Sequence, residues 1–513
     1  MQRMFAQARP DRIVQTDCAS MRNLSLFAAA GLTVGLLLQA CGSDGDPAIP
    51  GNPDGGASNP DGGGNDADGA AGPRTILDVT CAGSGRASFP VGVGASEDLA
   101  RGVSRRSDGS TLLVGTVDEP TSTESIQDSW FAGLKLKADC TIDTSYGSNG
   151  LAFFSTSNPD YQVEEIHRFV PNADGSALFF GTSTQPVATV QGFAVTAAKL
   201  TAGGQKDATF GVPFTPIVKA ESPTQPETFT IKGVEAAADG TYRIIAQTTP
   251  PFDGLAFLTF DGTKFDAAKT RLVPFTTLAG VYEPHRVESF HTYPDGSMLI
   301  AGTFDRAGGT SQLPGVLKLK PDGTVDTTFG TEGVAGTGPA GAVESRTFLA
   351  VQPDGKILLA ATLHLDDHYQ SFGVMRFDAA GTIDLAFGTG GVALVDIGTG
   401  RWTTTDNVHT LEAFHLGADG SMLLAGEVQA LDDAAGANAR ATHVGVARFL
   451  ANGTLDPAFV EGGTFDGAAL AGGKKETLDG LDLDASGTLS LAATHENAQD
   501  DSDWVIYRFV RQP

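Results

Sequence analysis

Short apolar runs of about five residues recur along the chain, and each follows a turn that carries Gly. Three examples are TLLVG at 111–115, MLIAG at 298–302 and ILLAA at 357–361. Runs of this length are typical of strands, and the lack of polar alternation indicates strands that are buried on both faces. No long stripe with helical spacing follows the N-terminal segment, so the pattern predicts an all-β protein.

The turn that precedes each apolar run occurs seven times, at intervals of 56 to 67 residues. Most copies contain Asp-Gly, a pair suited to tight hairpins because Gly accepts positive φ and Asp tolerates it. The seven glycines are Gly109, Gly175, Gly240, Gly296, Gly355, Gly420 and Gly487. A repeat with this period predicts an array of seven like units.

Each unit continues with a third strand that carries one basic residue, and it closes with a turn of the form Asp-x-x-Phe-Gly. The basic positions are Lys135, Lys199, Lys318, Arg376, Arg448 and Arg508. The turn aspartates are Asp143, Asp207, Asp326, Asp384 and Asp456. Because chemistry usually needs a single site, this recurrence favours a structural ion pair or turn cap in every unit over a catalytic or ligand-binding set.

These motifs, clearest in GTVDTTFG at 323–330 and GTIDLAFG at 381–388, resemble the delta-60 repeat of bacterial surface and secreted proteins. The resemblance covers about 75–513 and is weakest in the third unit, where FDAA at 265–268 replaces Asp-x-x-Phe. It implies a propeller-like fold, and the family brings no established catalytic residues.

The last unit stops after its third strand, at Tyr507–Phe509, and lacks a closing turn. The N-terminal segment supplies one, because Leu77–Cys81 aligns with Val325–Phe329 and a strand near Ala87–Val93 can pair with the C-terminal strand. Ring closure hides sheet edges, whereas an open solenoid would need capping units. The sequence therefore predicts a seven-bladed β-propeller of four-stranded blades over 74–513, its last blade closed by the N-terminal strand.

Residues 1–40 are typical of an export signal whose true start is Met21. The uncharged run from Leu24 to Ala40 is shorter than the roughly 20 residues of a membrane-spanning helix. Leu38–Cys41 resembles the bacterial lipobox, which implies lipidation of Cys41; the alternative is ordinary secretory cleavage beside an incidental cysteine. By the same resemblance, Gly42 in place of Asp favours the outer membrane or cell surface.

The following segment, 41–73, is predicted to be a lipid-anchored flexible tether. Residues 42–73 contain ten Gly, six Asp and no Lys or Arg, so they cannot bury enough apolar surface to fold. The whole chain has 61 acidic and 34 basic residues, a net charge of −27, which disfavours a nucleic-acid partner. The expected state is a monomer attached to the membrane by its lipid.

Two cysteines remain once Cys41 is lipidated and Cys18 is lost with the signal: Cys81 and Cys140. An even number in an oxidising compartment predicts a disulfide that ties the closing strand to the first blade. The alternative is two buried thiols, because Cα atoms more than ~7 Å apart cannot be bridged.

No metal site or cofactor is expected, since the chain lacks the motifs of serine hydrolases, phosphate-binding loops and zinc proteases. The one histidine-rich cluster, His364–His368, falls in a variable loop, where a solvated loop is favoured over a metal site. Trp130, Trp402 and Trp504 are expected to pack in the core or at the rim rather than to stack on a sugar.

The loops between second and third strands vary between units, and in a propeller they emerge on one face. They carry acidic residues: Asp118, Glu119, Glu124, Asp128, Glu427, Asp432, Asp433, Glu496, Asp500, Asp501 and Asp503. Loops on a rigid scaffold often bind ligands, although solvated surface charge is the alternative. The preferred interpretation is a surface-anchored, non-catalytic module that binds a protein or carbohydrate through this face.

The alternative is a propeller-type hydrolase or lyase with its site in the central channel. Such an enzyme would need histidines and carboxylates converging from several blades. His167, His291 and His415 are the candidates.

Overall fold

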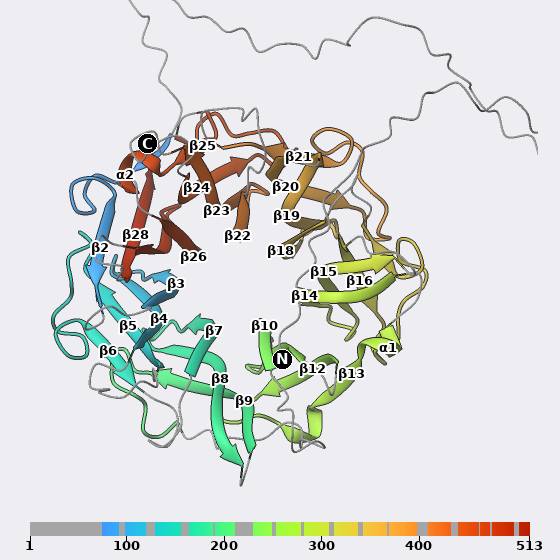
Figure 1. Cartoon of the computed structure of the whole chain (residues 1–513), viewed down its shortest axis with the longest axis horizontal. Coiled ribbons are helices and arrows are strands. Elements are labelled where there is room, and N and C mark those ends of the chain that lie inside the picture. Colours follow the sequence, from blue (N-terminus) through green and yellow to red (C-terminus); the bar gives the residue numbers. More distant parts are fainter. Residues whose placement is uncertain are drawn as a thin grey trace, which may run out of the picture. The chain divides into compact units, whose positions relative to one another are not determined.

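Seven antiparallel sheets are arranged as the blades of a β-propeller (Figure 1). The all-β, seven-bladed fold expected from the sequence is therefore confirmed. The computed structural model describes residues 74–91, 98–118, 129–154, 164–187, 190–210, 229–248, 253–278, 282–306, 312–336, 342–366, 369–397, 409–431, 440–460, 462–471, 475–496 and 502–512. All of them belong to one compact unit, Asp68–Pro513.

The blades follow one another in sequence order, and the first strand of each lies nearest the central axis (Figure 1). From the axis outward, blade one consists of β3 (Leu99–Arg105), β4 (Thr111–Asp118), β5 (Ser129–Leu136) and β6 (Leu151–Phe154). Blade two consists of β7 (Glu164–Pro171), β8 (Ala177–Val187) and β9 (Val190–Leu200). Blade three consists of β10 (Phe229–Ala236), β11 (Tyr242–Thr248), β12 (Gly254–Phe260) and β13 (Arg271–Pro274).

Blade four consists of β14 (Tyr282–Thr292), β15 (Met298–Arg306), β16 (Gln312–Leu319) and β17 (Val334–Ala335). Blade five consists of β18 (Ala342–Val351), β19 (Ile357–Asp366), β20 (Tyr369–Phe377) and β21 (Val392–Val395). Blade six consists of β22 (Thr410–Leu416), β23 (Met422–Leu431), β24 (Arg440–Phe449) and β25 (Thr464–Asp466). Blade seven combines β26 (Glu476–Leu483), β27 (Leu489–Glu496) and β28 (Ser502–Arg511) with the N-terminal β1 (Thr75–Leu77) and β2 (Arg86–Pro90).

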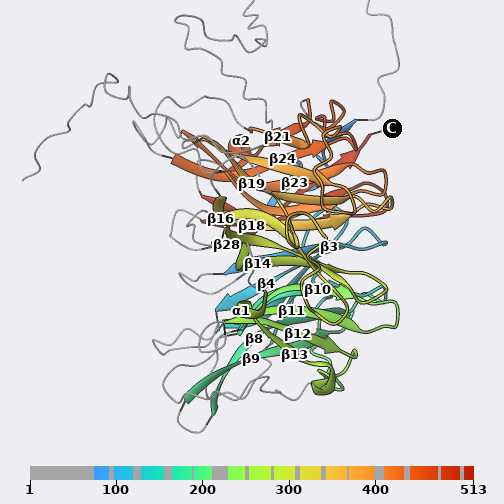
Figure 2. The same ribbon diagram turned by 90° about the vertical axis from the view of Figure 1, so that its right-hand side faces the viewer.

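Figure 2 shows the ring from its side, with the strands of successive blades stacked one above another. Two blades depart from the expected four strands. Blade two has three described strands, and the place of a fourth falls within 211–228, outside the described residues. In blade seven β2 takes the place of the fourth strand, and the additional β1 pairs with the C-terminal end of β28, where blade four has the single bridge Leu319↔Val325.

Three short helices complete the described part of the chain: a 3-10 turn at Ala267–Lys269, α1 (Phe275–Leu278) and α2 (Ala468–Ala471). None of the helices in the described residues is long and apolar enough to cross a membrane.

The hairpin between first and second strands has the chemistry expected of Asp-Gly. In blade one, Gly109 has φ 83°, and Asp108 Oδ1 accepts hydrogen bonds from the Ser110 backbone nitrogen at 2.8 Å and hydroxyl at 2.6 Å. The apolar second strands are buried on both faces, as their sequences predicted; Leu299 and Leu358 are completely buried. These strands form the cores between neighbouring blades.

An aromatic residue and a glycine meet at three of the joints between blades. The aromatic closes the Asp-x-x-Phe turn of one blade, and the glycine lies in the corresponding turn of the next. At Phe329 and Gly381, an added Cβ on the glycine would lie 2.9 Å from the ring, and the Gly330 nitrogen donates to the Ala380 carbonyl at 2.8 Å. The pairs Phe387–Gly453 and Tyr146–Gly204 repeat this contact.

The closing fragment reproduces this turn with residues from the other end of the chain. The Asp78 nitrogen donates to the Arg508 carbonyl at 2.8 Å, as Asp326 does to Lys318 at 2.8 Å. β2 pairs with β28 in the register Arg86↔Tyr507 to Pro90↔Asp503, so the predicted strand near 87–93 begins and ends slightly earlier. In Figure 1 the N-terminal β2 lies beside the C-terminal β28.

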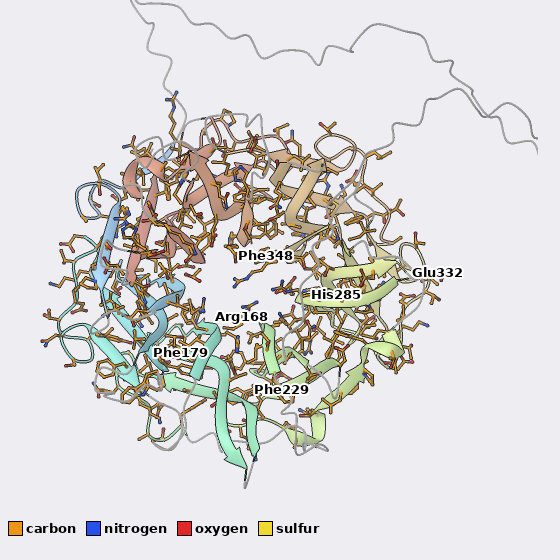
Figure 3. The ribbon with its side chains drawn as sticks, in the orientation of Figure 1. Arg168, Phe179, Phe229, His285, Glu332 and Phe348 are labelled. Atoms are coloured by element: carbon orange, nitrogen blue, oxygen red, sulfur yellow. A yellow bond between two sulfur atoms is a disulfide. The ribbon has the colours of Figure 1, made fainter. Side chains whose placement is uncertain are left out.

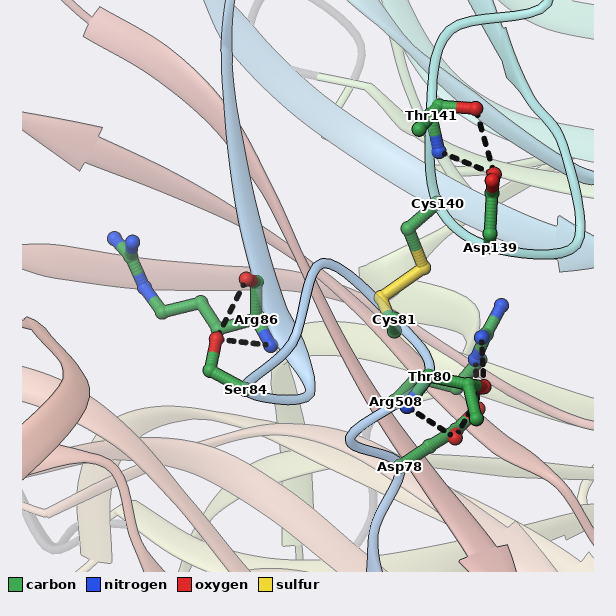
Figure 4. Close-up of a disulfide and its surroundings, with 9 residues drawn as sticks. All are labelled: Asp78, Thr80, Cys81, Ser84, Arg86, Asp139, Cys140, Thr141 and Arg508. Atoms are coloured by element: carbon green, nitrogen blue, oxygen red, sulfur yellow. Dashed lines mark hydrogen bonds and ion pairs between the residues drawn. A yellow bond between two sulfur atoms is a disulfide. The ribbon is translucent and has the colours of Figure 1, made fainter.

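The joint between blades seven and one contains a disulfide in place of the aromatic and the glycine. Cys81 stands where blade four has Phe329, and Cys140 stands where blade five has Gly381. The expected bond is present, with a Cα–Cα distance of 4.9 Å (Figure 4). Cys140 keeps the positive φ of the glycines it replaces, 63°, which is unusual for a residue with a side chain.

Blade three departs less from the repeat than its sequence suggested. Asp266 occupies the turn position, and its nitrogen donates to the Thr259 carbonyl at 2.8 Å. The expectation that FDAA replaces the motif was therefore out of register. Blade three differs from the repeat at two other positions: Lys269 stands where other blades have the aromatic residue of the turn, and Thr259 stands where they have the basic residue of the third strand.

Candidate functional site

The inner strand of every blade carries a β-bulge, and an ionisable residue lies at each one. The register shifts occur beside Arg101, His167, Lys232, Glu288, Arg346, Glu412 and Asp479. A bulge adds a residue that has no partner in the ladder and redirects its side chain. Here all seven residues line the central channel.

These residues surround a cavity of about 330 Å³ to which the inner strands of all seven blades contribute. Its size falls at the lower end of the range of small-molecule sites. Two positions after every bulge residue an apolar side chain follows, and all seven line the cavity: Val103, Phe169, Val234, Phe290, Phe348, Phe414 and Leu481. In Figure 3 the labelled Phe348 and Arg168 lie close to the central opening.

Six of the bulge residues form three ion pairs between neighbouring blades. Arg101 Nη1 lies 3.0 Å from Asp479 Oδ1, joining blades one and seven. Lys232 Nζ lies 3.2 Å from Glu288 Oε1, joining blades three and four. Arg346 Nε lies 3.0 Å from Glu412 Oε2, joining blades five and six. The pairs place both signs of charge at fixed points around the cavity.

The seventh bulge residue, His167, is neutral at physiological pH. Burial and the charges of Arg168, Arg101, Lys232 and Arg346 together lower its pKa to about 3, and burial is the largest cause. Its Nε2 lies 3.0 Å from the Thr182 hydroxyl.

Arg168, the residue after this bulge, breaks a second pattern. At the same position the other blades carry only small residues: Gly102, Gly233, Ser289, Thr347, Ala413 and Gly480. The guanidinium of Arg168 donates to the His167 carbonyl at 2.7 Å and to the Lys232 carbonyl at 2.6 Å. Within the described residues it forms no ion pair with a carboxylate.

Burial raises the pKa values of Glu412 and Glu427 in blade six and of Asp479 in blade seven. It brings Glu412 and Glu427 to about 7 each, although Arg346 opposes the shift at both; neighbouring carboxylates add to it. Burial also raises the pKa of Asp479, against the charge of Arg101. Near neutral pH, Glu412 and Glu427 are therefore close to half protonated.

The three histidines singled out in the sequence do not converge. His167 lines the cavity, but His291 and His415 do not. His291 Nδ1 lies 3.3 Å from Glu235, and its ring meets Tyr293 edge-on with centroids 5.0 Å apart. Burial lowers the pKa of His415, and the charge of Asp482 acts in the opposite direction.

The repeated aspartates lie far out on the blades, at the turns that follow the third strands. Each pairs with the basic residue of that strand: Lys135–Asp143 at 3.0 Å, Lys199–Asp207 at 3.4 Å, Lys318–Asp326 at 3.5 Å, Arg376–Asp384 at 3.0 Å and Arg448–Asp456 at 3.4 Å. Their side chains also cap the turns; Asp326 Oδ1 accepts from Thr328. This geometry is that of a repeated structural contact.

Several other sequence candidates lie partly or wholly outside the described residues. Cys41, Trp402, His368 and most of the acidic loop residues belong to this group. Within the described ranges, no group of three or more His, Cys, Asp or Glu side chains is placed to hold a metal ion. Trp504 is fully buried, and Trp130 packs on Phe153 with ring centroids 5.8 Å apart.

The bulge residues were missed because each looks ordinary in its own unit. The sequence does carry a signal for these positions. When the seven inner strands are aligned, each shows a charged residue or histidine, then a small residue, then an apolar residue, and Arg168 is the one large residue at the second position. Reading the seven units one below another would have identified the position.

Three segments of the chain, 294–329, 352–387 and 417–459, match the family described as a domain of unknown function (DUF5122) beta-propeller. They correspond to parts of blades four, five and six. No protein with a curated description is similar enough in sequence to count as a relative.

Solved structures resemble the chain only distantly. A polysaccharide lyase of family PL25, an ulvan lyase, is 9% identical, with a TM-score of 0.44 over 79% of this chain and 94% of its own. A protein of unknown function from Dyadobacter fermentans is 12% identical, with a TM-score of 0.38 over 71% and 98%. The α-L-arabinofuranosidase Arb93A of Fusarium graminearum is 11% identical, with a TM-score of 0.34 over 81% and 93%.

Proposed function

We propose that this protein is a non-catalytic binding module of the delta-60 repeat type, which receives its ligand in the central channel. The observation that carries the proposal is the convergence of seven inner-strand side chains, one from each blade, on a cavity of about 330 Å³. Six of them are fixed in ion pairs, so the polar groups are already in place before a ligand arrives. The loop face is a second candidate surface for a protein or carbohydrate partner.

Binding in the channel can be tested by narrowing it. Ala413 lines the cavity and is a buried member of the core between blades six and seven, so Ala413→Leu adds bulk where the channel wall meets this core. Ala386 lies exposed on an outer turn, and Ala386→Leu is the matched control. A ligand found by thermal-shift screening of sugars, organic acids and peptides should lose affinity for Ala413→Leu alone. Equal binding by both variants would move the site out of the channel.

The membrane attachment forms the second part of the proposal. Leu38–Cys41 supports a lipid on Cys41, and the glycine- and aspartate-rich segment that follows suits a tether to the outer membrane or cell surface. Cys41→Ser should move the protein from the membrane to the soluble fraction in cell fractionation. Cys18→Ser, upstream of the proposed start, should leave it in the membrane. Membrane retention of the Cys41→Ser protein would refute lipid attachment at this residue.

One observation favours a hydrolase or lyase as the second candidate. Glu412 and Glu427 have pKa values raised to about 7 by burial, which suits a carboxyl group that gives and takes a proton at neutral pH. The test is whether the protein releases products from polysaccharides. If it does, and if Glu412→Gln abolishes this release without lowering the Tm, the protein is an enzyme rather than a non-catalytic binding module.

A further inference from the structure

Among the cations that line the cavity, Arg168 of blade two differs from the others in its contacts. Four cationic side chains line the cavity: Arg101, Arg168, Lys232 and Arg346. Three of them face a carboxylate at 3.0–3.2 Å, in the pairs already described. The fourth, Arg168, faces only backbone carbonyl groups through its two hydrogen bonds.

The remaining carboxylate of the cavity is not directed at Arg168. Glu235 lies 3.3 Å from His291 Nδ1 and accepts from the Thr292 backbone nitrogen at 3.0 Å. Glu288 is shared between Lys232 and Arg286. Blades two to four therefore place Arg168 and Lys232 on the channel wall, and the two carboxylates that line it there, Glu235 and Glu288, form their ion pairs with side chains other than Arg168.

The pKa of His167 reflects the cations around this part of the channel. After burial, the main causes that lower its pKa to about 3 are four cations, Arg168, Arg101, Lys232 and Arg346. Arg168 itself keeps its charge: burial and the charge of Arg346 lower its pKa to about 10, and the charge of Glu288 acts in the opposite direction. A guanidinium that forms no ion pair with a carboxylate in a partly enclosed site gains most from an anion that it can bind through two parallel hydrogen bonds.

We propose that the channel holds an oxyanion subsite in which Arg168, with Lys232 beside it, binds the carboxylate of a small organic acid. The planar, forked guanidinium matches the two oxygens of a carboxylate. Phe169, Phe348 and Phe414 are only partly buried and line the same cavity, so they offer an apolar surface to the body of the ligand. This inference rests on the proposed binding function and specifies its ligand class.

The carboxylates opposite the site make anion binding depend on pH. Glu412 faces Arg346, Glu427, Asp479 and Glu288, and its pKa is raised to about 7 by burial. As the pH falls from 8 to 6, Glu412 takes up a proton and one negative charge leaves the cavity. The probes stay ionised in this range because carboxylic acids have pKa values of about 4. Affinity for a carboxylate should therefore rise severalfold.

Calorimetric titration with matched probes tests the subsite. D-glucuronate is compared with glucose, and benzoate with benzyl alcohol, because each pair shares a body and differs mainly in the carboxylate; sulfate tests whether any oxyanion suffices. The full-length Cys41→Ser protein should bind at least one of the two carboxylates, and its neutral partner at least about tenfold more weakly. Tight binding of sulfate alone would assign the subsite to an inorganic anion and overturn the organic-acid assignment.

The variants assign the binding to Arg168. Arg168→Met keeps most of the side-chain length without the charge and should lower carboxylate affinity at least tenfold, whereas Arg168→Lys should restore part of it. Arg511→Met, on an exposed strand end, removes the same charge elsewhere and should have no effect. A Tm measurement confirms that each variant is folded.

The possible failures are distinguishable. Neutral probes that bind as tightly as the acids, or acids that bind Arg168→Met as well as the parent, would overturn the oxyanion subsite and leave the channel as a binding site. Failure of all five probes at millimolar concentration would also overturn the subsite. The proposed binding function would fall only if the wider ligand screen and the Ala413→Leu comparison failed as well.

Discussion

The joint between blades seven and one differs from the joint between blades four and five in chemistry but not in geometry. Both place one turn against the next, and in both a backbone nitrogen crosses to the neighbouring turn: Gly330 to Ala380 at 2.8 Å, Ala82 to Asp139 at 3.3 Å. The ordinary joint packs Phe329 on Gly381, whereas the closing joint bonds Cys81 to Cys140 (Figure 4).

The ion pair of the closing turn is also more buried than its equivalents. Arg508 Nε lies 2.6 Å from Asp78 Oδ2, with side chains 1% and 9% exposed. Lys318 and Asp326 lie 3.5 Å apart and are 25% and 17% exposed. A second buried contact, Arg86 with Glu476, links β2 to β26 at 2.5 Å. The closing region thus concentrates strong contacts where the two chain ends meet.

The difference teaches how a ring can be closed by a short segment. The closing fragment is held to blade seven only by non-covalent contacts, because it comes from the opposite end of the chain. The disulfide ties this fragment to blade one, which lies nearby in sequence. Fixing the fragment lowers the entropy that closure must overcome.

Removal of the closing fragment should have the largest effect. A chain that begins at residue 92 lacks β1, β2 and Asp78, and it exposes the edge of β28; a chain that begins at 74 keeps them all. With Cys140→Ser in both, the shorter chain should aggregate or melt at least about 10 °C lower, because several kcal/mol of closure contacts are lost. Equal melting temperatures would favour an open solenoid.

Loss of the disulfide should have the next largest effect. Cys81→Ser with Cys140→Ser opens a loop of 59 residues and should cost about 4 kcal/mol of unfolding free energy, measured by denaturant titration. The pair Cys81→Phe with Cys140→Gly should recover part of this loss, since it rebuilds the aromatic–glycine contact and relieves the positive φ at 140. No recovery would show that the two kinds of joint are not interchangeable.

The smallest effect should come from the two turn aspartates. Asp78→Asn leaves Arg508 buried without a counter-charge and should cost about 3 kcal/mol, whereas Asp326→Asn in its more exposed pair should cost about 1 kcal/mol or less. Equal losses from the two substitutions in chemical denaturation would contradict the role of burial.

The loss of unfolding free energy caused by Asp78→Asn should also depend on pH. Burial acts to raise the pKa of Asp78, but hydrogen bonds from Thr80 and the charge of Arg508 outweigh it, so the pKa is lowered from 3.8. The contribution of this carboxylate is thus present above about pH 4 and is lost as the pH falls through the folded value. The stability gap between the parent and Asp78→Asn should therefore narrow in acid.

The sequence by itself determined the local chemistry and, through repetition, the architecture. Asp-Gly turns, Asp-x-x-Phe turns and apolar second strands act within a few residues, so each could be recognised separately and then counted. The unmatched last unit and the leading fragment at 77–81 together specified a ring. The cysteine pair followed from its number, although the sequence did not exclude two free thiols.

Tertiary structure alone decided which charges meet. Arg101 and Asp479 lie at opposite ends of the repeat array, and nothing near either one indicates the other; only ring closure brings them to 3.0 Å. Likewise, the channel exists because seven bulges point to one axis, a property of the assembled ring rather than of any unit. Turn chemistry depends on neighbours in sequence, whereas the candidate site depends on neighbours in space, and those are set when the ring closes.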